Sequence, residues 1–188
     1  MLSVIVATLN CERSLARTLA ALVPGAVEGL VSEAIVADGG SRDGTAMVAD
    51  AAGCTFAIED GPVGRRLKIA AAKARAPYLL FVRPGIVLDT GWVNEAARFI
   101  ERSSPDQNAA VCRRGAVQQT ALRELSALLA GALGALPHPG QGLLIGRGFY
   151  EALGGHSEAA ADPERDLIRR VGRRRLVTLA ASATEILD

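Results

Sequence analysis

The first hundred residues alternate between short apolar runs and longer amphipathic segments. Four nearly continuous apolar runs are typical of buried strands, and they occupy residues 2–8, 33–37, 54–58 and 78–82. Between these runs, apolar residues recur every three or four positions, which predicts helices with one buried face at residues 12–22, 43–52 and 64–74. Strands that alternate with helices of this length indicate right-handed crossovers and a mostly parallel central sheet.

Local signals place the helix ends, and the second half of the chain is less regular. Pro24 and Gly25 are expected to end the first helix, and Ser41 or Asp43 to cap the second. Further strands are predicted at residues 109–113, 143–145 and 176–180. Further helices are predicted at residues 90–102, 118–136 and 162–171. The pattern as a whole predicts one domain over residues 1–188, a Rossmann-like three-layer α/β/α sandwich.

The predicted helix at 118–136 is apolar on more than one face. We interpret it as a buried helix or as the contact face of a homodimer. The alternative is peripheral contact with a membrane, because an apolar helix face can also lie on a lipid surface. Its most apolar part, residues 125–136, is too short to span a bilayer.

Composition and charge exclude several classes of protein. The 188 residues are 49% hydrophobic but only 4% aromatic, which suits an aliphatic α/β core and argues against disorder. A net charge of +1 gives no general attraction to nucleic acid. Arginines crowd residues 165–175, and we interpret them as a solvated helix face, with contact to an anion or acidic lipid as the alternative. Three widely spaced cysteines and no signal-peptide pattern predict a cytoplasmic protein with reduced thiols.

An acidic turn carries the clearest chemical signal in the chain. The predicted strand at 33–37 leads directly into Asp38-Gly39-Gly40 and then into a helix. This order places a carboxylate and free backbone N–H groups at the carboxyl edge of a parallel sheet, where open α/β sheets bind ligands. The carboxylate suits a base or ribose donor, and the helix N-terminus suits an anion.

These motifs together resemble the family 2 glycosyltransferases, inverting enzymes with the GT-A fold. The similar segments are 3–10, 33–45, 64–72 and 140–155, so the resemblance extends over nearly the whole chain. It implies a nucleoside-diphosphate sugar as donor substrate. It also implies a division of the domain into a nucleotide-binding half, residues 1–85, and an acceptor-side half, residues 86–188.

The resemblance assigns donor-binding roles to residues at the ends of the first two strands and in the third helix. Asp38 would accept a hydrogen bond from the base, and Thr8 and Asn10 would line the base and ribose pocket. Arg65 and Arg66 would approach the pyrophosphate, because a guanidinium matches phosphate in geometry and charge.

The chain departs from the family at the metal site. The family holds Mg²⁺ or Mn²⁺ through an Asp-x-Asp sequence, or at least a final Asp, after the fourth strand, but this chain has Arg83-Pro84-Gly85 there. We therefore predict no metal ligands at this position. Either Arg83 replaces the ion as the positive charge on the diphosphate, or catalysis has been lost.

The general base is the second point of departure. Aligning the family's late basic segment on Arg169-Arg170 places Glu164 where the catalytic carboxylate is expected. Asp162 or Asp166 would serve if the register slips, and a simple first-turn helix carboxylate is the alternative interpretation of Glu164. The expected function is inverting sugar transfer to an unknown acceptor, with a lipid-linked acceptor and a membrane-peripheral location as options. The competing hypothesis is a catalytically inactive nucleotide-binding or scaffold module that retains the fold.

Overall fold

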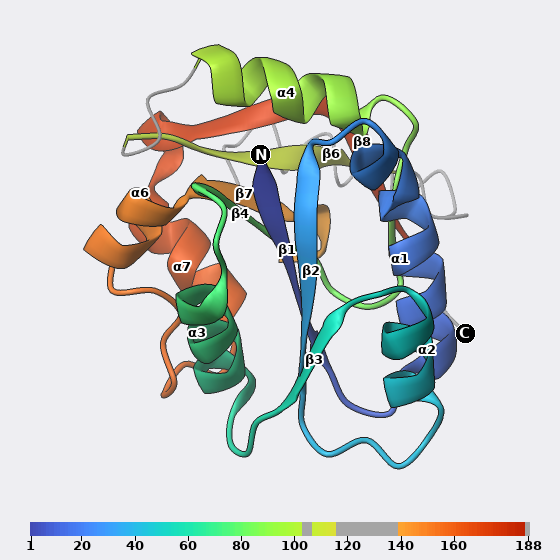
Figure 1. Cartoon of the computed structure of the whole chain (residues 1–188). Coiled ribbons are helices and arrows are strands. Elements are labelled where there is room, and N and C mark those ends of the chain that lie inside the picture. The colour runs from blue at the N-terminus through green and yellow to red at the C-terminus, as the bar shows by residue number, and fades with distance from the viewer. Residues whose placement is uncertain (103–106, 116–138, 187–188) are drawn as a thin grey trace, which may run out of the picture.

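The computed structural model describes residues 1–102, 107–115 and 139–186 of the chain and contains one continuous sheet (Figure 1). Its strands follow the order β3-β2-β1-β4-β7-β6-β8-β5. Their bounds are β1 Leu2–Thr8, β2 Val31–Asp38, β3 Thr55–Ile58, β4 Tyr78–Phe81, β5 Ile86–Leu88, β6 Ala109–Arg114, β7 Leu143–Gly146 and β8 Leu176–Glu185.

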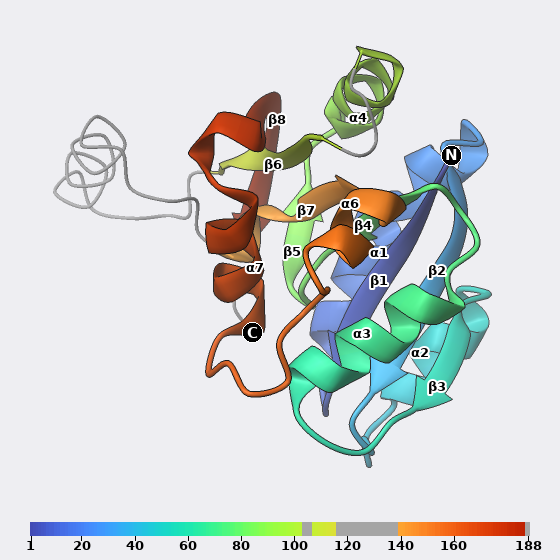
Figure 2. The same cartoon turned by 90° about the vertical axis from the view of Figure 1, so that its left-hand side faces the viewer.

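Helices cover both faces of the sheet. The bounds of the α-helices are α1 Glu12–Val27, α2 Thr45–Ala51, α3 Val63–Lys73, α4 Trp92–Arg102, α6 Arg147–Ala152 and α7 Pro163–Val171, and short 3₁₀ turns occupy Pro139–Gln141 and Arg173–Arg175. One hydrophobic core packs α1, α2 and α4 against the sheet, and a second core on the opposite face packs α3, α6 and α7. The views in Figures 1 and 2 show these helices on either side of the strands. The predicted three-layer α/β/α class with a mostly parallel sheet is confirmed.

Parallel pairing brings the ends of the first strands to one edge. β1 pairs in parallel with β2 on one side and with β4 on the other, and Thr8 lies opposite Asp38. The strands of the second half join the same sheet, where β7 runs antiparallel to both β4 and β6. The loops that follow β1, β2 and β4 therefore emerge at the same edge of the sheet, as parallel topology requires.

The prediction that Pro24 and Gly25 end the first helix is wrong, because α1 continues through both residues to Val27. A proline near the end of a helix loses only one backbone hydrogen bond. The last turn is held by other contacts: the N–H of Glu28 donates to the Pro24 carbonyl at 2.9 Å, and Trp92 Nε1 donates to the Ala21 carbonyl at 3.1 Å.

Sequence periodicity also missed two short elements and one cap. Neither β5 nor α6 is long enough to show a period, and both were absent from the prediction. The residue at the N-cap of α2 is Gly44, while the side chain of Asp43, one position earlier, accepts from the Thr45 N–H at 3.1 Å. The predicted helix at 118–136 lies outside the described residues, so the homodimer and membrane-surface hypotheses that depend on it stay predictions. Within the described ranges no helix is both long and apolar enough to cross a membrane.

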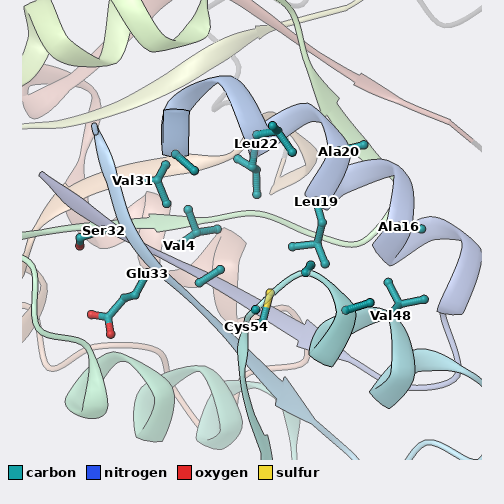
Figure 3. Close-up of a pocket in the computed structure, with 16 residues that line it drawn as sticks. Val4, Ala16, Leu19, Ala20, Leu22, Val31, Ser32, Glu33, Val48 and Cys54 are labelled. Atoms are coloured by element: carbon teal, nitrogen blue, oxygen red, sulfur yellow. The ribbon is translucent and has the colours of Figure 1, made fainter. Parts of the chain in front are cut away.

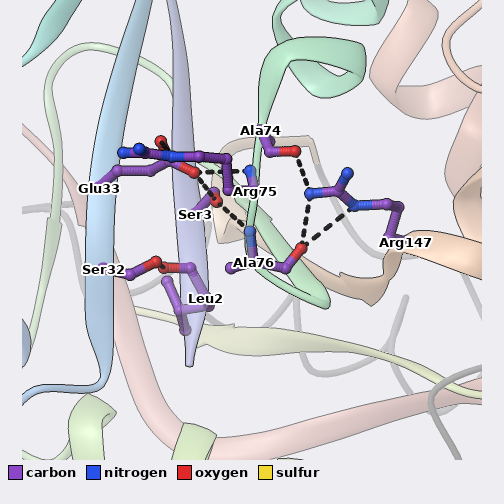
Figure 4. A network of polar contacts seen from close by, with 8 residues as sticks. All are labelled: Leu2, Ser3, Ser32, Glu33, Ala74, Arg75, Ala76 and Arg147. Atoms are coloured by element: carbon purple, nitrogen blue, oxygen red, sulfur yellow. Dashed lines mark hydrogen bonds and ion pairs between the residues drawn. The ribbon is translucent and has the colours of Figure 1, made fainter.

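A polar network fixes the opposite, amino-terminal side of the sheet (Figure 4). Glu33 of β2 accepts from the Ser3 hydroxyl at 2.6 Å and from the Arg75 backbone N–H at 2.7 Å. Arg147 donates to the Ala76 carbonyl through Nε at 3.2 Å and through Nη2 at 2.8 Å. These bonds satisfy the backbone between α3 and β4, so the network is structural.

Candidate functional site

Side chains tie together the two loops that follow β1 and β2 at the carboxyl edge of the sheet. Asn10, in a left-handed backbone conformation with φ 49°, receives the Arg42 N–H on its side-chain oxygen at 2.8 Å and donates its own N–H to Ser41 Oγ at 2.8 Å. The N–H of Glu12 donates to Asp43 at 3.1 Å, and Glu12 in turn accepts the Gly44 N–H at 3.1 Å. The residues of the acidic turn are thus largely engaged in holding these two loops to each other.

Asp38 lies at the centre of this edge, with 1% of its surface exposed. Its Oδ1 accepts from the Thr8 hydroxyl at 2.7 Å and the Ser41 hydroxyl at 2.5 Å. Its Oδ2 accepts from the backbone N–H groups of Gly40 at 2.8 Å and Ser41 at 2.6 Å. Burial alone would raise the pKa of Asp38, but the bonds from Ser41, Thr8 and Gly40 outweigh it and the pKa is lowered. Asp38 is therefore ionised, and a carboxylate's usual capacity of about four hydrogen bonds is filled within the chain.

The two arginines predicted to approach a pyrophosphate lie in different surroundings. Arg66 is buried, with 8% of its surface exposed, and its Nη1 donates to the carbonyls of Thr8 at 2.6 Å and Ala37 at 3.2 Å. Its Nε is buried and, within the described chain, has no hydrogen-bond partner. Arg65 is exposed at the start of α3, where its side chain lies beside Gly61. Arg66 thus faces the sheet, whereas Arg65 faces solvent.

A cleft of about 400 Å³ opens at the same edge, on the face of the sheet covered by α3 and α7. The loop that leads into α7 passes beside the start of α3 (Figure 2), where Gly64 lies so close to Ser157 and Pro163 that a side chain would not fit. The cleft is lined by Ala7, Val63, Val82, Arg83, Pro84, Ala161, Asp162, Pro163 and Glu164. It is therefore built from both halves of the chain.

Arg83 and Glu164, which are 81 positions apart in the sequence, meet in this cleft. Arg83 Nε donates to Glu164 Oε2 at 2.7 Å, and Arg83 Nη2 donates to Asp162 Oδ1 at 3.2 Å. The same Asp162 oxygen accepts the Arg165 N–H at 3.1 Å and so caps α7. Asp162 was expected only as a substitute base. Its pairing with Arg83 was missed, although the opposite charges of the two segments were a signal of it.

Glu164 has a strongly perturbed acidity. Burial raises the pKa of Glu164 to about 7, against the opposing effect of the Arg83 guanidinium, and the charge of Asp162 adds to the rise. A carboxyl group with a pKa near neutrality suits proton transfer at physiological pH. The cleft is therefore lined by a carboxyl group whose pKa lies near neutrality.

The predicted site residues therefore form two groups at one edge. Thr8, Asn10 and Asp38 belong to the hydrogen-bonded loops, and Arg83 and Glu164 belong to the cleft. Arg66 lies beneath the ends of β1 and β2, and Arg65 stands outside both groups.

A second pocket, of about 560 Å³, lies between α1 and α2 on the other face of the sheet (Figure 3). Its walls are mainly aliphatic, with contributions from Val4, Leu19, Val31 and Val48. The carboxylate of Glu33 at its rim is held by Ser3 and Arg75. Although this pocket is larger, it presents no pair of groups suited to acid, base or phosphate chemistry.

The family is decided by sequence comparison. Residues 3–138, well over half of the chain, match the family described as Glycosyl transferase family 2. The chain belongs to glycosyl transferase family 2. The match covers β1 through β4 and Arg83 and ends before α7, so Glu164 and Asp162 lie beyond it. A search of curated proteins found no match.

Solved structures agree with this family 2 fold. Glucosyl-3-phosphoglycerate synthase from Mycobacterium tuberculosis, in complex with Mn²⁺, UDP and glucosyl-3-phosphoglycerate, superposes with a TM-score of 0.70 at 22% identity, over 100% of this chain and 72% of that chain. The same enzyme with Mn²⁺ and UDP-glucose superposes with a TM-score of 0.67 at 23% sequence identity, over 95% of this chain and 68% of that chain. S. aureus TarS 1-349 superposes with a TM-score of 0.74 at 17% sequence identity, over 98% of this chain and 60% of that chain. These likenesses support the predicted GT-A fold.

The residues of the cleft do not suit the divalent metal that the family resemblance implies. A Mg²⁺ or Mn²⁺ site needs several oxygen ligands directed at one point. Here the two carboxylates of the cleft are directed at the guanidinium of Arg83, which would repel a metal ion. In the part of the chain that the structure describes, no group of three or more His, Cys, Asp or Glu side chains is arranged to hold one.

Proposed function

We propose that this family 2 protein transfers a sugar from a nucleoside-diphosphate sugar to an acceptor hydroxyl with inversion, using Arg83 in place of a metal ion. The observation that carries the proposal is the meeting of Arg83 and Glu164 at 2.7 Å within one cleft at the carboxyl edge of the sheet. A cation and a carboxyl group with a pKa of about 7 are the two groups that metal-free inverting transfer requires.

The proposed step uses each group once. Glu164 takes the proton from the acceptor hydroxyl as the acceptor oxygen bonds to the anomeric carbon of the sugar. The bond from that carbon to the phosphate oxygen breaks, and the electron pair leaves with the nucleoside diphosphate. Arg83 offsets the negative charge that develops on this leaving group, as a fixed guanidinium can do. Attack on the face opposite to the leaving group gives inversion.

The nucleoside would lie across the loops that follow β1 and β2. Thr8, Asn10 and Asp38 would lie at the base and ribose, and the exposed Arg65 would lie near the pyrophosphate. Because the oxygens of Asp38 already accept four bonds, contact with a base would require it to exchange one of them. The Ser41 and Thr8 hydroxyls can rotate away, whereas the backbone N–H groups of Gly40 and Ser41 are fixed. Arg66 would support this pocket from below through the ends of β1 and β2.

The competing hypothesis is a binding or scaffold module without catalysis. One observation favours it: the charge of Arg83 is already neutralised by Asp162 and Glu164, so an anion gains less from it. The two hypotheses differ in whether a nucleotide sugar is consumed.

Calorimetry and a turnover assay test the proposal. UDP, GDP and UDP-glucose would be titrated into the protein in EDTA and again in Mn²⁺. We expect one nucleotide to bind with the same affinity in EDTA and in Mn²⁺. Arg83→Gln should weaken this affinity about tenfold, the effect of losing one charge-assisted hydrogen bond. Arg98→Gln, which changes an exposed arginine of α4, is the matched control.

Glu164→Gln should then bind the donor and release no sugar from it. If UDP, GDP and UDP-glucose all fail to bind with or without metal, the proposal is rejected. Binding without consumption of the donor by the unsubstituted protein, in an acceptor screen, supports the inactive module instead.

A further inference from the structure

The cleft holds its own counterions before any ligand enters. Its lining contains one cation, Arg83, and two carboxylates, Asp162 and Glu164. Both carboxylates point at the guanidinium, through Nη2 at 3.2 Å and Nε at 2.7 Å. The carboxylates take two of the five N–H groups of the guanidinium, both on its Nε–Nη2 edge. A diphosphate that binds this edge with two parallel hydrogen bonds needs the same two groups. The two kinds of anion therefore compete for this edge of Arg83 and for its charge.

The backbone of Arg83 is fixed while its side chain has room to move. The Arg83 carbonyl accepts from the Ile86 N–H at 3.2 Å, and the Gly85 N–H donates to Thr18 Oγ1 at 2.9 Å, which anchors the turn after β4 to α1. The side chain is 40% exposed along the cleft. The guanidinium can thus change partners without movement of the strand.

Asp162 joins the guanidinium to the start of α7. Its Oδ1 accepts both Arg83 Nη2 and the Arg165 N–H, so one oxygen caps the helix and holds the arginine. Glu164 follows two residues later in the first turn of the same helix. The side chain of Asp162 therefore sets both where Arg83 rests and where Glu164 is presented.

We propose that the donor diphosphate and the Asp162–Glu164 pair compete for Arg83, and that Asp162 is the positioning residue that holds the arginine on Glu164 until the donor arrives. This inference rests on the proposed function. Binding of the donor transfers the guanidinium from the carboxylates to the phosphates and leaves Glu164 without its ion partner. Oε2 of Glu164, which accepts Arg83 Nε at 2.7 Å without ligand, is then open to the acceptor hydroxyl. Loss of the cation raises the pKa of Glu164 further, so proton transfer from the acceptor is expected to need a pH above about 7.

Calorimetry with UDP in EDTA tests whether the nucleotide competes with the carboxylates for Arg83. This exchange of partners is distinct from a general attraction of the nucleotide to positive charge. Asp162→Asn keeps a capping oxygen but removes the charge that competes for Arg83. We expect it to bind UDP about threefold more tightly, the size of a partly exposed ion pair. Glu164→Gln, at a less exposed carboxylate, should bind about tenfold more tightly. Glu158→Gln, an exposed carboxylate on the loop before α7, is the control for loss of a negative charge and should not change the affinity.

Steady-state kinetics give a readout that a folding defect would not produce. Asp162→Asn should lower KM for the donor, whereas a misplaced α7 would raise KM and lower kcat together. If the unsubstituted protein binds UDP but Asp162→Asn and Glu164→Gln bind it no more tightly, the exchange is wrong and the proposed function stands. If UDP binds to none of these proteins, the proposed function fails for this nucleotide and the exchange with it.

Discussion

At the scale of single residues, Glu164 is the group whose chemistry depends most on its surroundings. Only 12% of its side chain is exposed, and it faces the guanidinium of Arg83 and the carboxylate of Asp162. Burial and Asp162 favour the protonated form, and Arg83 favours the ionised form. The balance raises the pKa of Glu164 from 4.5 to about 7.

This shift has a definite effect on stability. Between pH 4.5 and about 7 the folded protein keeps a proton that the unfolded chain has released, so the contribution of Glu164 is fully present below pH 4.5 and is lost as the pH rises through about 7. Glu164→Gln has no proton to lose. Its free energy of unfolding relative to the unsubstituted protein should therefore rise by about 2 to 3 kcal/mol between pH 5 and pH 8.

Urea unfolding at the two pH values measures this difference, with Glu158→Gln as the control for removal of a charge. A difference between Glu164→Gln and the unsubstituted protein that is the same at pH 5 and pH 8 would show that Glu164 titrates normally. It would also remove the reason for choosing this residue as a base at neutral pH.

Arg66 and its neighbour Arg65 offer a matched pair. Arg66 fastens the carbonyls at the ends of β1 and β2, whereas Arg65 is exposed. We expect Arg66→Ala to lower the free energy of unfolding by about 2 kcal/mol, the scale of a hydrogen bond from a charged donor. Arg65→Ala should change it by less than about 0.5 kcal/mol and should weaken nucleotide binding instead. Chemical denaturation and calorimetry on both variants check this. Equal stability losses would mean that Arg65 is also structural.

At the scale of elements, the end of α1 depends on contact with α4. The backbone of Gly25 lies so close to Trp92 that a Cβ atom would be 2.5 Å from Cζ2 of the indole. Gly25→Ala should therefore destabilise the protein by about 1 to 3 kcal/mol, the usual cost of overpacking. In a Trp92→Phe background the outer ring is absent, and the same change should cost less, with the methyl group of Val31 at 2.9 Å as the remaining close contact. Urea unfolding of the four proteins measures the coupling. Additive losses would show that the indole is not what Gly25 accommodates.

This contact is one reason why the sequence did not predict the end of α1, whereas other elements of the first half could be predicted. The strands of the first half follow from continuous apolar runs, and the helices between them follow from their period, because each buries one face locally. The end of α1 around Pro24 packs against Trp92 and accepts a hydrogen bond from it, and Trp92 is far away in the sequence. Short elements such as β5 depend on pairing, here with the end of β8, and carry too few residues to show a period.

The candidate site shows a similar division. The acidic turn could be located from its residues, because a strand followed by Asp-Gly-Gly has a local signature. The four internal hydrogen bonds of Asp38 could not be predicted from the residues alone. They depend on the register between β1 and β2 and on the conformation of the following loop. Residue types therefore located the loops of the candidate site, and the fold determined which of their polar atoms are already engaged within the chain.

At the scale of the whole molecule, the cleft is formed by residues from inside and outside the segment that matches the family. The match extends over residues 3–138, and the carboxylates of the cleft come later, at the start of α7. The antiparallel strand β7, inserted between β4 and β6, joins the second half to the first. Arg83 and the carboxylates of α7 then connect the two across the cleft. A ligand in this cleft should therefore be detected in both halves at once.

Hydrogen exchange with mass spectrometry tests this expectation on the intact chain. Addition of UDP-glucose in EDTA should slow exchange in three separate stretches, at residues 62–66, 82–86 and 161–166, since each contributes to the cleft. The loop at 38–45 should be slowed as well if the base lies there. Arg83→Ala should speed exchange at 161–166 without ligand, because it removes the ion pairs that hold the start of α7, and leave β1 and β2 unchanged. Protection confined to 38–45 would place the nucleotide outside the cleft. Arg83 would then not contact its diphosphate.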